Sequence, residues 1–429
     1  MQYHCAGIGV GPSNLSLASL LHSYQDVSGI FFERKREFSW HEGLQLPGSS
    51  LQVLPLKDLV TLSDPRNFFS FISYLYESGR IYQFLNARFD DVPRKEFENY
   101  MKWASRQNAL LNFSEEVVSV DFADLFIVRT AKRTIRAENV SVAVGTEPHV
   151  PDFALPHLGA TQFHVGEFAR KAGTLARKRI AVVGGGQSGA EAFLNLISRE
   201  GDRAPHQVTW ISRRENFLPM DDSPFTNEYF MPCHSDYFFA QDRSYRESFV
   251  RRNVLASDGI SERTLRQIYQ RIYTLRLIDD QLPAIVLAPD RTVRTVARDG
   301  AQWRLAAEHH ASGAHDIVHA DVVIWATGFR TARMDFLGPL AHRLDREGDE
   351  IRIDGDFAAR WDGPADRRIF LLNAARQQRG LPDPNLSLMA WRSQRVIDRI
   401  SGRSVTRRPQ HPAFVPWAPA PLPAERQAV

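Results

Sequence analysis

Residues 9–14 read Gly9-Val10-Gly11-Pro12-Ser13-Asn14, and residues 184–189 read Gly184-Gly185-Gly186-Gln187-Ser188-Gly189. Each stretch follows an apolar run that predicts a strand and opens a segment that predicts a helix. A glycine-rich turn in this position binds the pyrophosphate of a dinucleotide at the helix N-terminus. Two such turns in one chain indicate a protein that holds a flavin and a nicotinamide nucleotide together, which narrows the function to flavin-dependent oxidoreductases.

The first turn matches the fingerprint of a dinucleotide site in all but one position. We expect a strand over residues 3–8 and the start of a helix over residues 15–21. Gly9 makes the tight turn, and Gly11 lets the backbone approach the phosphates. Asn14 stands where the third glycine usually lies, so this turn by itself is a weaker signal than the full fingerprint.

A carboxylate decides which nucleotide the first turn prefers. The next expected strand, residues 30–32, ends in Glu33, about twenty residues after the turn. A carboxylate there accepts hydrogen bonds from ribose hydroxyls and repels a 2′-phosphate, so the site favours FAD. The alternative is a solvated charge at a strand end, because residues 34–36 are all basic.

The second turn is the fuller match, with Gly189 at the third position of the fingerprint. Residues 180–183 predict the strand before it, and residues 208–211 predict the strand after its helix. That later strand ends in Ser212-Arg213-Arg214 instead of an acid. Guanidinium groups bind phosphate in bidentate fashion, so the second site favours NADPH over NADH. A basic surface corner is the alternative.

The composition limits the function further. The chain has 429 residues, enough for two or three cores. It has no apolar run of the roughly 18 residues that span a bilayer, and its first twenty residues lack the features of a signal peptide. Cys5 and Cys233 form no disulfide framework, zinc motif or redox pair, so we expect a cytoplasmic protein. The net charge of +3 is too small to predict nucleic-acid binding.

The order of predicted elements gives an α/β fold with two Rossmann-like dinucleotide-binding domains and a small helical substrate domain. Apolar residues at helical spacing over 261–275 predict a helix, and residues 321–325 predict a buried strand at which the chain returns to the first domain. The expected division is 1–165 for the first part of the FAD-binding domain, 166–220 with 282–318 for the NADPH-binding domain, 221–281 for the small helical substrate-binding region, 319–402 for the second part of the FAD-binding domain, and 403–429 for a proline-rich C-terminal tail.

Histidines cluster at His309, His310, His315 and His319. The last two are four residues apart, but Gly313 and the strand-like run that follows argue against a helix that would present both to one metal. We interpret the cluster as a surface hairpin or loop and expect no metal site.

Five stretches of the chain resemble the N-hydroxylating flavin monooxygenases of siderophore biosynthesis, and the similarity covers nearly the whole sequence. The closing stretch, Asp-Pro-Asn-Leu-Ser-Leu-Met-Ala-Trp-Arg-Ser at 383–393, is most similar to the branch of L-lysine N6-monooxygenases and diamine N-monooxygenases. The ornithine branch usually carries a longer amino-terminal extension. The five stretches are residues 38–43, 51–65, 182–190, 222–230 and 373–393.

The resemblance implies a reaction cycle that the cofactors carry out. NADPH reduces FAD, the reduced flavin forms a C4a-hydroperoxyflavin with O2, and a neutral primary amine attacks its distal oxygen. No side chain is expected to do covalent chemistry. The implied function is the first step of hydroxamate siderophore biosynthesis, with a homo-oligomer (tetramer or dimer) as the assembly. The implied substrate is L-lysine or a diamine such as putrescine or cadaverine.

The amine sets the main chemical problem. An alkylammonium has a pKa near ~10.4, so it is almost wholly charged at neutral pH. The site must therefore favour the free amine through low polarity or a proton acceptor. Trp40 and the aromatic segment 225–230 are candidates for an apolar wall.

Several site residues follow from the resemblance alone. Lys57 matches a lysine that contacts substrate, although a lysine in an apolar stretch also snorkels. Gln52 matches a glutamine that lies against the flavin, and Asn227 matches an asparagine that binds substrate, although asparagine often caps helices. Arg379 replaces a histidine of many relatives, and a cation there is expected to alter flavin contacts or repel an ammonium.

The complete expected site combines the two turns with these matches. The expected substrate-binding residues are Lys57, Asn227 and Ser387. The expected FAD-binding residues are Gly9, Gly11, Pro12, Ser13, Asn14, Glu33, Trp40, His41, Gln52 and Asn385. The expected NADPH-binding residues are Gly184, Gly186, Gln187, Ser188, Gly189, Ser212, Arg213, Arg214, Ala326, Thr327 and Gly328.

Three other functions stay open from the sequence. The first is an L-ornithine N5-monooxygenase, and the second is a general flavin or Baeyer–Villiger monooxygenase. The segments around Lys57 and Asn227 count against the second. The third is a non-enzymatic FAD- and NADPH-binding sensor, which loss of Lys57 or of a glycine turn would favour; both are present.

Overall fold

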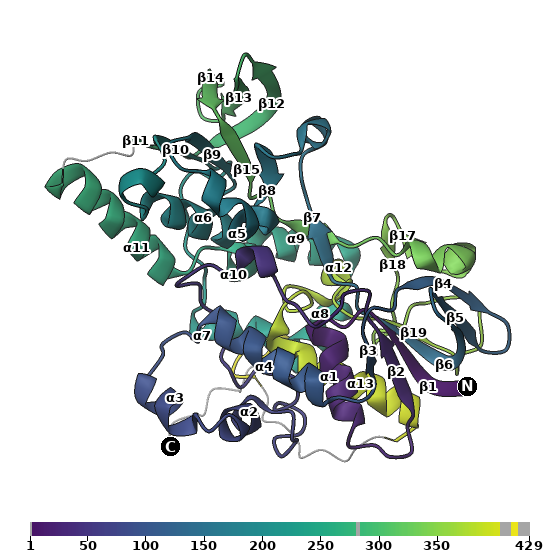
Figure 1. The fold of residues 1–429 in the computed structure, drawn as a ribbon. Coiled ribbons are helices and arrows are strands. Elements are labelled where there is room, and N and C mark those ends of the chain that lie inside the picture. The colour runs from purple at the N-terminus through teal and green to yellow at the C-terminus, as the bar shows by residue number, and fades with distance from the viewer. Residues whose placement is uncertain (1, 280–283, 404–412, 419–429) are drawn as a thin grey trace, which may run out of the picture.

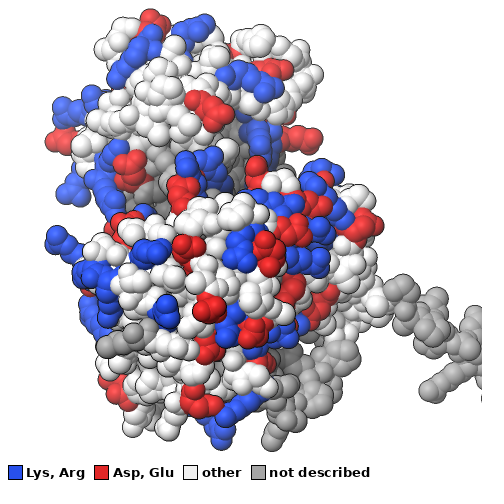
Figure 2. All heavy atoms as spheres, turned by 90° about the vertical axis from the view of Figure 1, so that its right-hand side faces the viewer, with Lys and Arg blue, Asp and Glu red and all other residues white. Residues whose placement is uncertain are grey.

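The computed structural model describes residues 2–279, 284–403 and 413–418, and Figure 1 shows their arrangement. Two domains, each built on a largely parallel sheet, make up the molecule, with the second domain at the top of the view. Figure 2 shows it from the side, where an upper and a lower lobe meet and basic and acidic side chains are interspersed. In the described part of the chain, no helix is long and apolar enough to cross a membrane.

The first sheet has seven strands in the order β3-β2-β1-β6-β5-β4, with β19 also paired to β6. The strands β3, β2, β1, β6 and β19 are parallel, and β4 and β5 extend the sheet in antiparallel fashion. The bounds are β1 (Gln2–Ile8), β2 (Gly29–Phe32), β3 (Leu111–Asn112), β4 (Val117–Phe122), β5 (Phe126–Thr130), β6 (Thr134–Val142) and β19 (Ile369–Leu371).

Helices cover one face of this sheet. The central helix, α1 (Pro12–Leu21), is buried along nearly its whole length because it carries leucines and alanine on all sides. It packs between α4 (Arg94–Gln107) and α13 (Met389–Ser401), and these helices share one core. Two further helices, α2 (Phe71–Glu77) and α3 (Ile81–Ala87), lie at the lower edge of Figure 1. The other face packs against the 3-10 helix Asp335–Arg343.

The second sheet has five parallel strands in the order β11-β10-β9-β15-β8. One face packs against α6 (Gln187–Ile197) and α11 (Glu262–Tyr273), and the other against an antiparallel meander that carries the histidine cluster on its last hairpin. The bounds are β8 (Gln162–His164), β9 (Arg179–Val183), β10 (Gln207–Ile211), β11 (Ala284–Ala288) and β15 (Val322–Trp325), with the meander formed by β12 (Arg291–Asp299), β13 (Gln302–His309) and β14 (His315–Ala320).

The structure moves two expected domain boundaries. The strand expected over 321–325, at the return to the first domain, is β15 and pairs with β9 at the centre of the second sheet. Likewise β8, inside the range expected for the first domain, pairs with β15. The chain crosses between domains at β7 (Thr146–Pro148) and returns at β16 (Phe329–Thr331), and these two strands pair with each other. A buried strand fits either sheet by its composition, so only the pairing assigns it.

The expected helical region divides between the two domains. Helix α11 belongs to the core of the second domain. In contrast, α8 (Pro232–Phe239) and α9 (Arg243–Arg252) pack on α12 (Arg376–Arg379), which follows the last strand of the first sheet. The short helices α7 (Pro224–Asn227) and α10 (Leu255–Asp258) complete the region, and α5 (Phe168–Lys171) lies beside the second sheet. Minor strands are β17 (Arg346–Glu347) and β18 (Glu350–Ile351).

Part of the expected C-terminal tail contacts the helical region. The backbone N–H groups of Phe414 and Val415 donate to the Glu228 carboxylate, both at 2.9 Å. The indole of Trp417 packs against the ring of His234, with centroids 4.6 Å apart. This segment is therefore wrapped onto the protein. The rest of the expected tail, residues 404–412 and 419–429, lies outside the described residues.

Candidate cofactor and substrate site

A cleft of about 1640 Å³ lies between the two domains, and both glycine-rich turns line it. The carboxyl ends of parallel strands lie at one edge of a sheet, and here that edge of each sheet faces the same space. Nineteen of the expected site residues line the cleft: Gly9, Gly11, Pro12, Ser13, Glu33, Trp40, His41, Gln52, Asn385, Gly184, Gly186, Gln187, Ser188, Ser212, Arg213, Arg214, Ala326, Thr327 and Gly328.

The two glycines of the first turn have different roles. Gly9 has a φ of +80°, and a Cβ there would lie 2.7 Å from the Ala143 carbonyl oxygen. A Cβ on Gly11 would have the same oxygen as its nearest neighbour, at 3.9 Å. Gly9 is therefore required by the fold, whereas the space at Gly11 is open toward the cleft and suits a phosphate.

Asn14 does not line the cleft, contrary to our expectation for an FAD-binding residue. Its side chain is fully buried and donates to the carbonyls of Ile8 and Gly9, at 3.2 and 2.8 Å, and of Ser141 at 3.2 Å. Its Oδ1 accepts from the Ser141 hydroxyl at 2.7 Å. Asn14 thus fixes the turn from behind by tying β1 to β6, in the position where other turns carry a glycine.

Glu33 is held in place by the turn. Its Oε2 accepts the Val10 backbone N–H at 2.9 Å, and its Oε1 accepts the Lys35 N–H at 3.0 Å. The side chain is half-buried and lines the cleft at the end of β2. An oriented carboxylate beside the first turn is the arrangement that a ribose requires, and it argues against the alternative of a solvated charge.

The second turn is packed more tightly. Gly184 has a φ of +139°, and a Cβ there would lie 2.0 Å from the Ala326 carbonyl oxygen. The indole N–H of Trp210 donates to the Gly184 carbonyl at 2.9 Å. Gly189 lies outside the cleft lining, and a Cβ there would lie 2.3 Å from the Gly184 carbonyl oxygen. Its role is therefore close packing of helix against turn, not contact with a nucleotide.

The side chain of Gln187 is occupied by protein partners. Its Nε2 donates to Glu191 at 2.9 Å and to the Thr264 hydroxyl at 3.1 Å, and its Oε1 accepts the Ser261 N–H at 2.8 Å. The expectation of a direct nucleotide contact is therefore wrong for this side chain. The residue still begins α6, so its backbone N–H faces the place where a pyrophosphate binds.

Arg213 and Arg214, at the end of β10, differ in their exposure and in their partners. Arg213 is exposed toward the cleft. Arg214 is half-buried, and its guanidinium donates to the carbonyls of Gly185 and Asp258, both at 2.9 Å. Since these carbonyls occupy the Arg214 guanidinium, Arg213 is the better candidate for a 2′-phosphate. Arg214 instead holds the turn against the last residue of α10 (Leu255–Asp258).

Three expected residues from distant segments meet beside the cleft. The Lys57 ammonium lies 3.5 Å from the Ser387 hydroxyl, which donates to Asn385 Oδ1 at 2.6 Å. The Ser387 N–H also donates to that oxygen, at 2.8 Å. Asn385 lines the cleft, while Ser387 is buried one step behind it. Partial burial lowers the pKa of Lys57, as expected for a cation partly removed from water.

Asn227 is not part of this group. It is exposed at the end of α7 and does not line the cleft. Its Nδ2 donates to the carbonyl of Asp222 at 2.7 Å, within its own turn. A local turn contact therefore accounts for this amide, whereas the helix-capping alternative is wrong for its side chain, which makes no capping hydrogen bond to the 3-10 helix Glu228–Phe230 that follows.

Arg379 does not line the cleft and is paired with Asp236 inside the fold, so the expected effect on the flavin or on an ammonium is wrong. The side chain is 1 % exposed and donates to Asp236 at 2.9 Å and to the Gly355 carbonyl. Its guanidinium lies 4.3 and 4.4 Å from the ring centroids of Phe239 and Phe357. The cation is paired inside the junction between α8 and α12.

The structure adds cleft residues that the sequence analysis missed. Phe329 lines the cleft, and its ring packs edge-on against His164, 4.9 Å between centroids. Arg376 also lines it and donates to Asp258 at 2.7 Å. That ion pair joins the last part of the first domain to the end of α10. The sequence indicates these two residues only through their position next to matched motifs. Phe329 follows Gly328, and Arg376 lies within 373–393.

Comparisons with known proteins agree with this geometry. The model of the L-lysine 6-monooxygenase/L-ornithine 5-monooxygenase family matches residues 1–331. An L-lysine N6-monooxygenase of Escherichia coli is 36 % identical over 96 % of this chain and 97 % of its own, and a putrescine N-hydroxylase of Acinetobacter baumannii is 29 % identical over 97 % and 94 %. The structure of a Kutzneria ornithine N-hydroxylase with reduced FAD, NADP+ and L-ornithine covers 94 % of this chain and 99 % of its own, with a TM-score of 0.86 and 27 % identity.

Proposed function

Because this chain belongs to the L-lysine 6-monooxygenase/L-ornithine 5-monooxygenase family, we propose that it hydroxylates the terminal amine of L-lysine. It is an NADPH-dependent flavin N-monooxygenase, with FAD and NADPH as its cofactors. The contact between Lys57 and Ser387, beside the cleft residue Asn385, carries the substrate proposal. It places a cation next to the cleft, where the carboxylate of an amino acid needs a partner.

The residues present suit both nucleotides. An added Cβ on Gly11 or Gly186 would meet no atom closer than 3.9 or 3.7 Å, which leaves space for a pyrophosphate at each helix N-terminus. In our proposal Glu33 binds the ribose of FAD, and Arg213 binds the 2′-phosphate of NADPH. When bound, the two cofactors supply the hydride and the oxygen chemistry. The protein positions the nucleotides across one cleft and limits the access of water.

The cleft wall helps to keep the substrate amine neutral. Trp40 and Phe329 both line the cleft and contribute apolar surface. Low polarity disfavours the charged form of an amine and so lowers its pKa toward neutrality. The aromatic segment 225–230 does not line the cleft: Phe225 is exposed, and Phe230 lies in a separate core with α8 and α9. We therefore assign the apolar wall to Trp40 and Phe329.

A diamine is the second candidate substrate, because one relative of this chain is a putrescine N-hydroxylase. A diamine has a second ammonium in place of the amino-acid carboxylate, so it would gain nothing from a cation beside the cleft.

The substrate proposal is tested with a matched pair of amines. Cadaverine is lysine without its carboxylate, so hydroxylamine formation with purified, FAD-loaded protein and NADPH compares the two directly. We expect lysine to have at least about tenfold higher kcat/KM, since a hydrogen bond to a charged group contributes about 1.5–3 kcal/mol. Equal or better turnover of cadaverine or putrescine would favour the diamine, and a preference for ornithine would favour the N5-monooxygenase.

Two failures of that assay point to other functions. NADPH oxidation that releases only peroxide with every amine would indicate a general flavin or Baeyer–Villiger monooxygenase. Binding of FAD and NADPH without NADPH oxidation would indicate a sensor.

An N-hydroxylated amine is the precursor of a hydroxamate, so we place the reaction at the first step of hydroxamate siderophore biosynthesis.

Arg213 and Arg214 give a prediction about the nicotinamide nucleotide. Arg213→Ala is expected to raise KM for NADPH about tenfold or more and to leave KM for NADH unchanged, because only NADPH carries the 2′-phosphate. Arg214→Ala is expected to raise both, since Arg214 holds the Gly185 carbonyl. Steady-state NADPH and NADH oxidation measures this. The control is Arg304→Ala, on the exposed side of β13. If Arg213→Ala raised KM for NADPH and for NADH equally, Arg213 would not bind the 2′-phosphate.

We also infer a homo-oligomer, a tetramer or a dimer, in the cytoplasm. Apolar side chains lie exposed on α2 and α3, among them Tyr76 at 71 % and Tyr82 at 77 % exposure. Exposed apolar surface of this kind supports contact between copies of the chain. The thiols of Cys5 and Cys233 are unpaired, which suits a reducing compartment. Light scattering on the purified protein measures the assembly, and a monomer at micromolar concentration contradicts it.

A further inference from the structure

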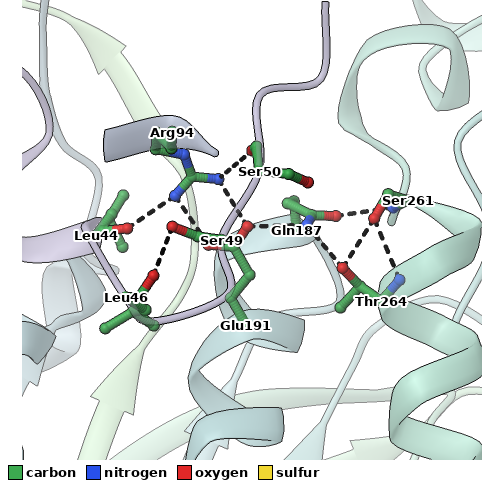
Figure 3. A network of polar contacts seen from close by, with 9 residues as sticks. All are labelled: Leu44, Leu46, Ser49, Ser50, Arg94, Gln187, Glu191, Ser261 and Thr264. Carbon is green, nitrogen blue, oxygen red and sulfur yellow. Dashed lines mark hydrogen bonds and ion pairs between the residues drawn. The ribbon is translucent and has the colours of Figure 1, made fainter. Parts of the chain in front are cut away.

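A buried ion pair joins the two nucleotide-binding domains (Figure 3). Arg94, at the start of α4 in the first domain, donates to both carboxylate oxygens of Glu191 on α6, at 2.9 and 2.7 Å. Its guanidinium also donates to the carbonyls of Leu44 and Ser50, at 2.8 and 3.3 Å. The two charged side chains are 11 % and 7 % exposed. The guanidinium is therefore held in one orientation by four contacts.

Glu191 also contacts the first residue of its own helix, α6. Its Oε1 accepts from Gln187 Nε2, one turn earlier in α6. Gln187 in turn contacts Ser261 and Thr264 at the start of α11, as Figure 3 shows. Because Gln187 is the first residue of α6, the end of the helix that faces the cleft is tied both to α4 and to α11.

The pair lies at a packed interface. A Cβ on Gly43 would lie 1.7 Å from the carbonyl oxygen of Gly166, so the backbones of the two domains touch there. Leu44 and Leu46 are buried in the core of the second domain, although they belong to the loop that leads to Gln52 and Lys57. One loop therefore carries residues of the proposed flavin and substrate site and also rests on the nicotinamide domain.

We propose that Arg94, Glu191 and Gln187 are positioning residues that fix the nicotinamide domain relative to the flavin domain, so that hydride transfer has its productive geometry. This inference rests on the proposed function of the cleft. A bidentate pair fixes direction as well as distance. Because desolvation offsets much of the attraction within a buried pair, we assign Arg94 and Glu191 to the arrangement of the domains and not to their stability. A small misplacement of two reacting groups lowers the reaction rate strongly. We therefore expect these contacts between the domains to affect the rate of hydride transfer from NADPH to the flavin.

The test uses a double substitution that keeps the interface apolar and close in volume, Arg94→Met with Glu191→Met. Replacing both members of a buried pair by apolar side chains preserves folding, whereas Glu191→Gln alone leaves a buried cation without its partner. We expect the limiting rate of anaerobic flavin reduction by NADPH to fall at least about tenfold in the double variant. The NADPH concentration at half-maximal rate and the FAD content are expected to stay unchanged.

The control is Glu42→Gln. Glu42 pairs with Arg170 between the same two parts of the chain, but both side chains are exposed, at 47 % and 67 %, so the pair is solvated and we expect no change in rate. A double variant that is folded and reduced as fast as the wild type would overturn the inference. Because the assay contains no amine and no oxygen, a wild-type flavin that NADPH fails to reduce would instead contradict the proposed function.

Discussion

Lys57→Ala is expected to lower hydroxylamine formation about 100-fold, while the protein stays folded and binds FAD. The ammonium of Lys57 lies 3.5 Å from the Ser387 hydroxyl and adjoins the cleft through Asn385. Loss of the cation removes the proposed partner of the substrate carboxylate and leaves the amine misplaced by about 1 Å or more, which is enough for a loss of this size. The measurement is hydroxylamine formed per NADPH oxidised, with flavin absorbance as the readout of bound FAD.

Two variants distinguish the charge of Lys57 from its packing. Lys57→Met keeps the length of the apolar stem and is expected to lose hydroxylation as Lys57→Ala does, because it lacks the ammonium that contacts the Ser387 hydroxyl. Lys132→Ala, on the exposed turn between β5 and β6, serves as a matched control without effect. Normal hydroxylation of lysine in either Lys57 variant would rule out the assigned role, and loss of FAD would show that the residue serves the cofactor.

Gly184→Ala has the second large expected effect. A methyl group there would lie 2.0 Å from the Ala326 carbonyl oxygen, at a φ of +139° that only glycine adopts without strain. Strain and overpacking together predict a loss of about 3 kcal/mol or more in the free energy of unfolding. In the protein that remains folded, NADPH is expected to reduce the flavin poorly, although dithionite reduces it normally and FAD stays bound to the first domain.

Gly173→Ala is the matched control, because it changes an exposed glycine of the same domain that has an ordinary φ and open space around its Cα. Unfolding by denaturant and anaerobic reduction of the flavin together measure the outcome. If Gly184→Ala and Gly173→Ala gave the same free energy of unfolding and the same rate of flavin reduction, the nearby Ala326 carbonyl would not be what requires glycine at position 184.

The two turns and the residues next to them could be predicted because their signals are local. Gly9, Gly11 and Glu33 lie within one strand-turn-helix-strand segment, and all three line the cleft. The same holds for Gly184 and Gly186. The residues expected from the family resemblance do not all line the cleft. Gln52 and Asn385 line it, whereas Asn227 does not. A motif match gives the segment, but the direction of a side chain depends on its neighbours in space.

What the sequence determined by itself is the pair of dinucleotide turns and, with them, the fold class and the cofactors, since glycine spacing and strand polarity act over a few residues. The tertiary structure decided the rest. It buried Asn14 against Ser141, occupied Gln187 with Ser261 and Thr264, paired Arg379 with Asp236, and assigned the strand Val322–Trp325 to the second sheet. Each outcome depends on a partner far along the chain or on another element. Burial makes such partners obligatory, because a polar group removed from water must find a hydrogen bond within the fold.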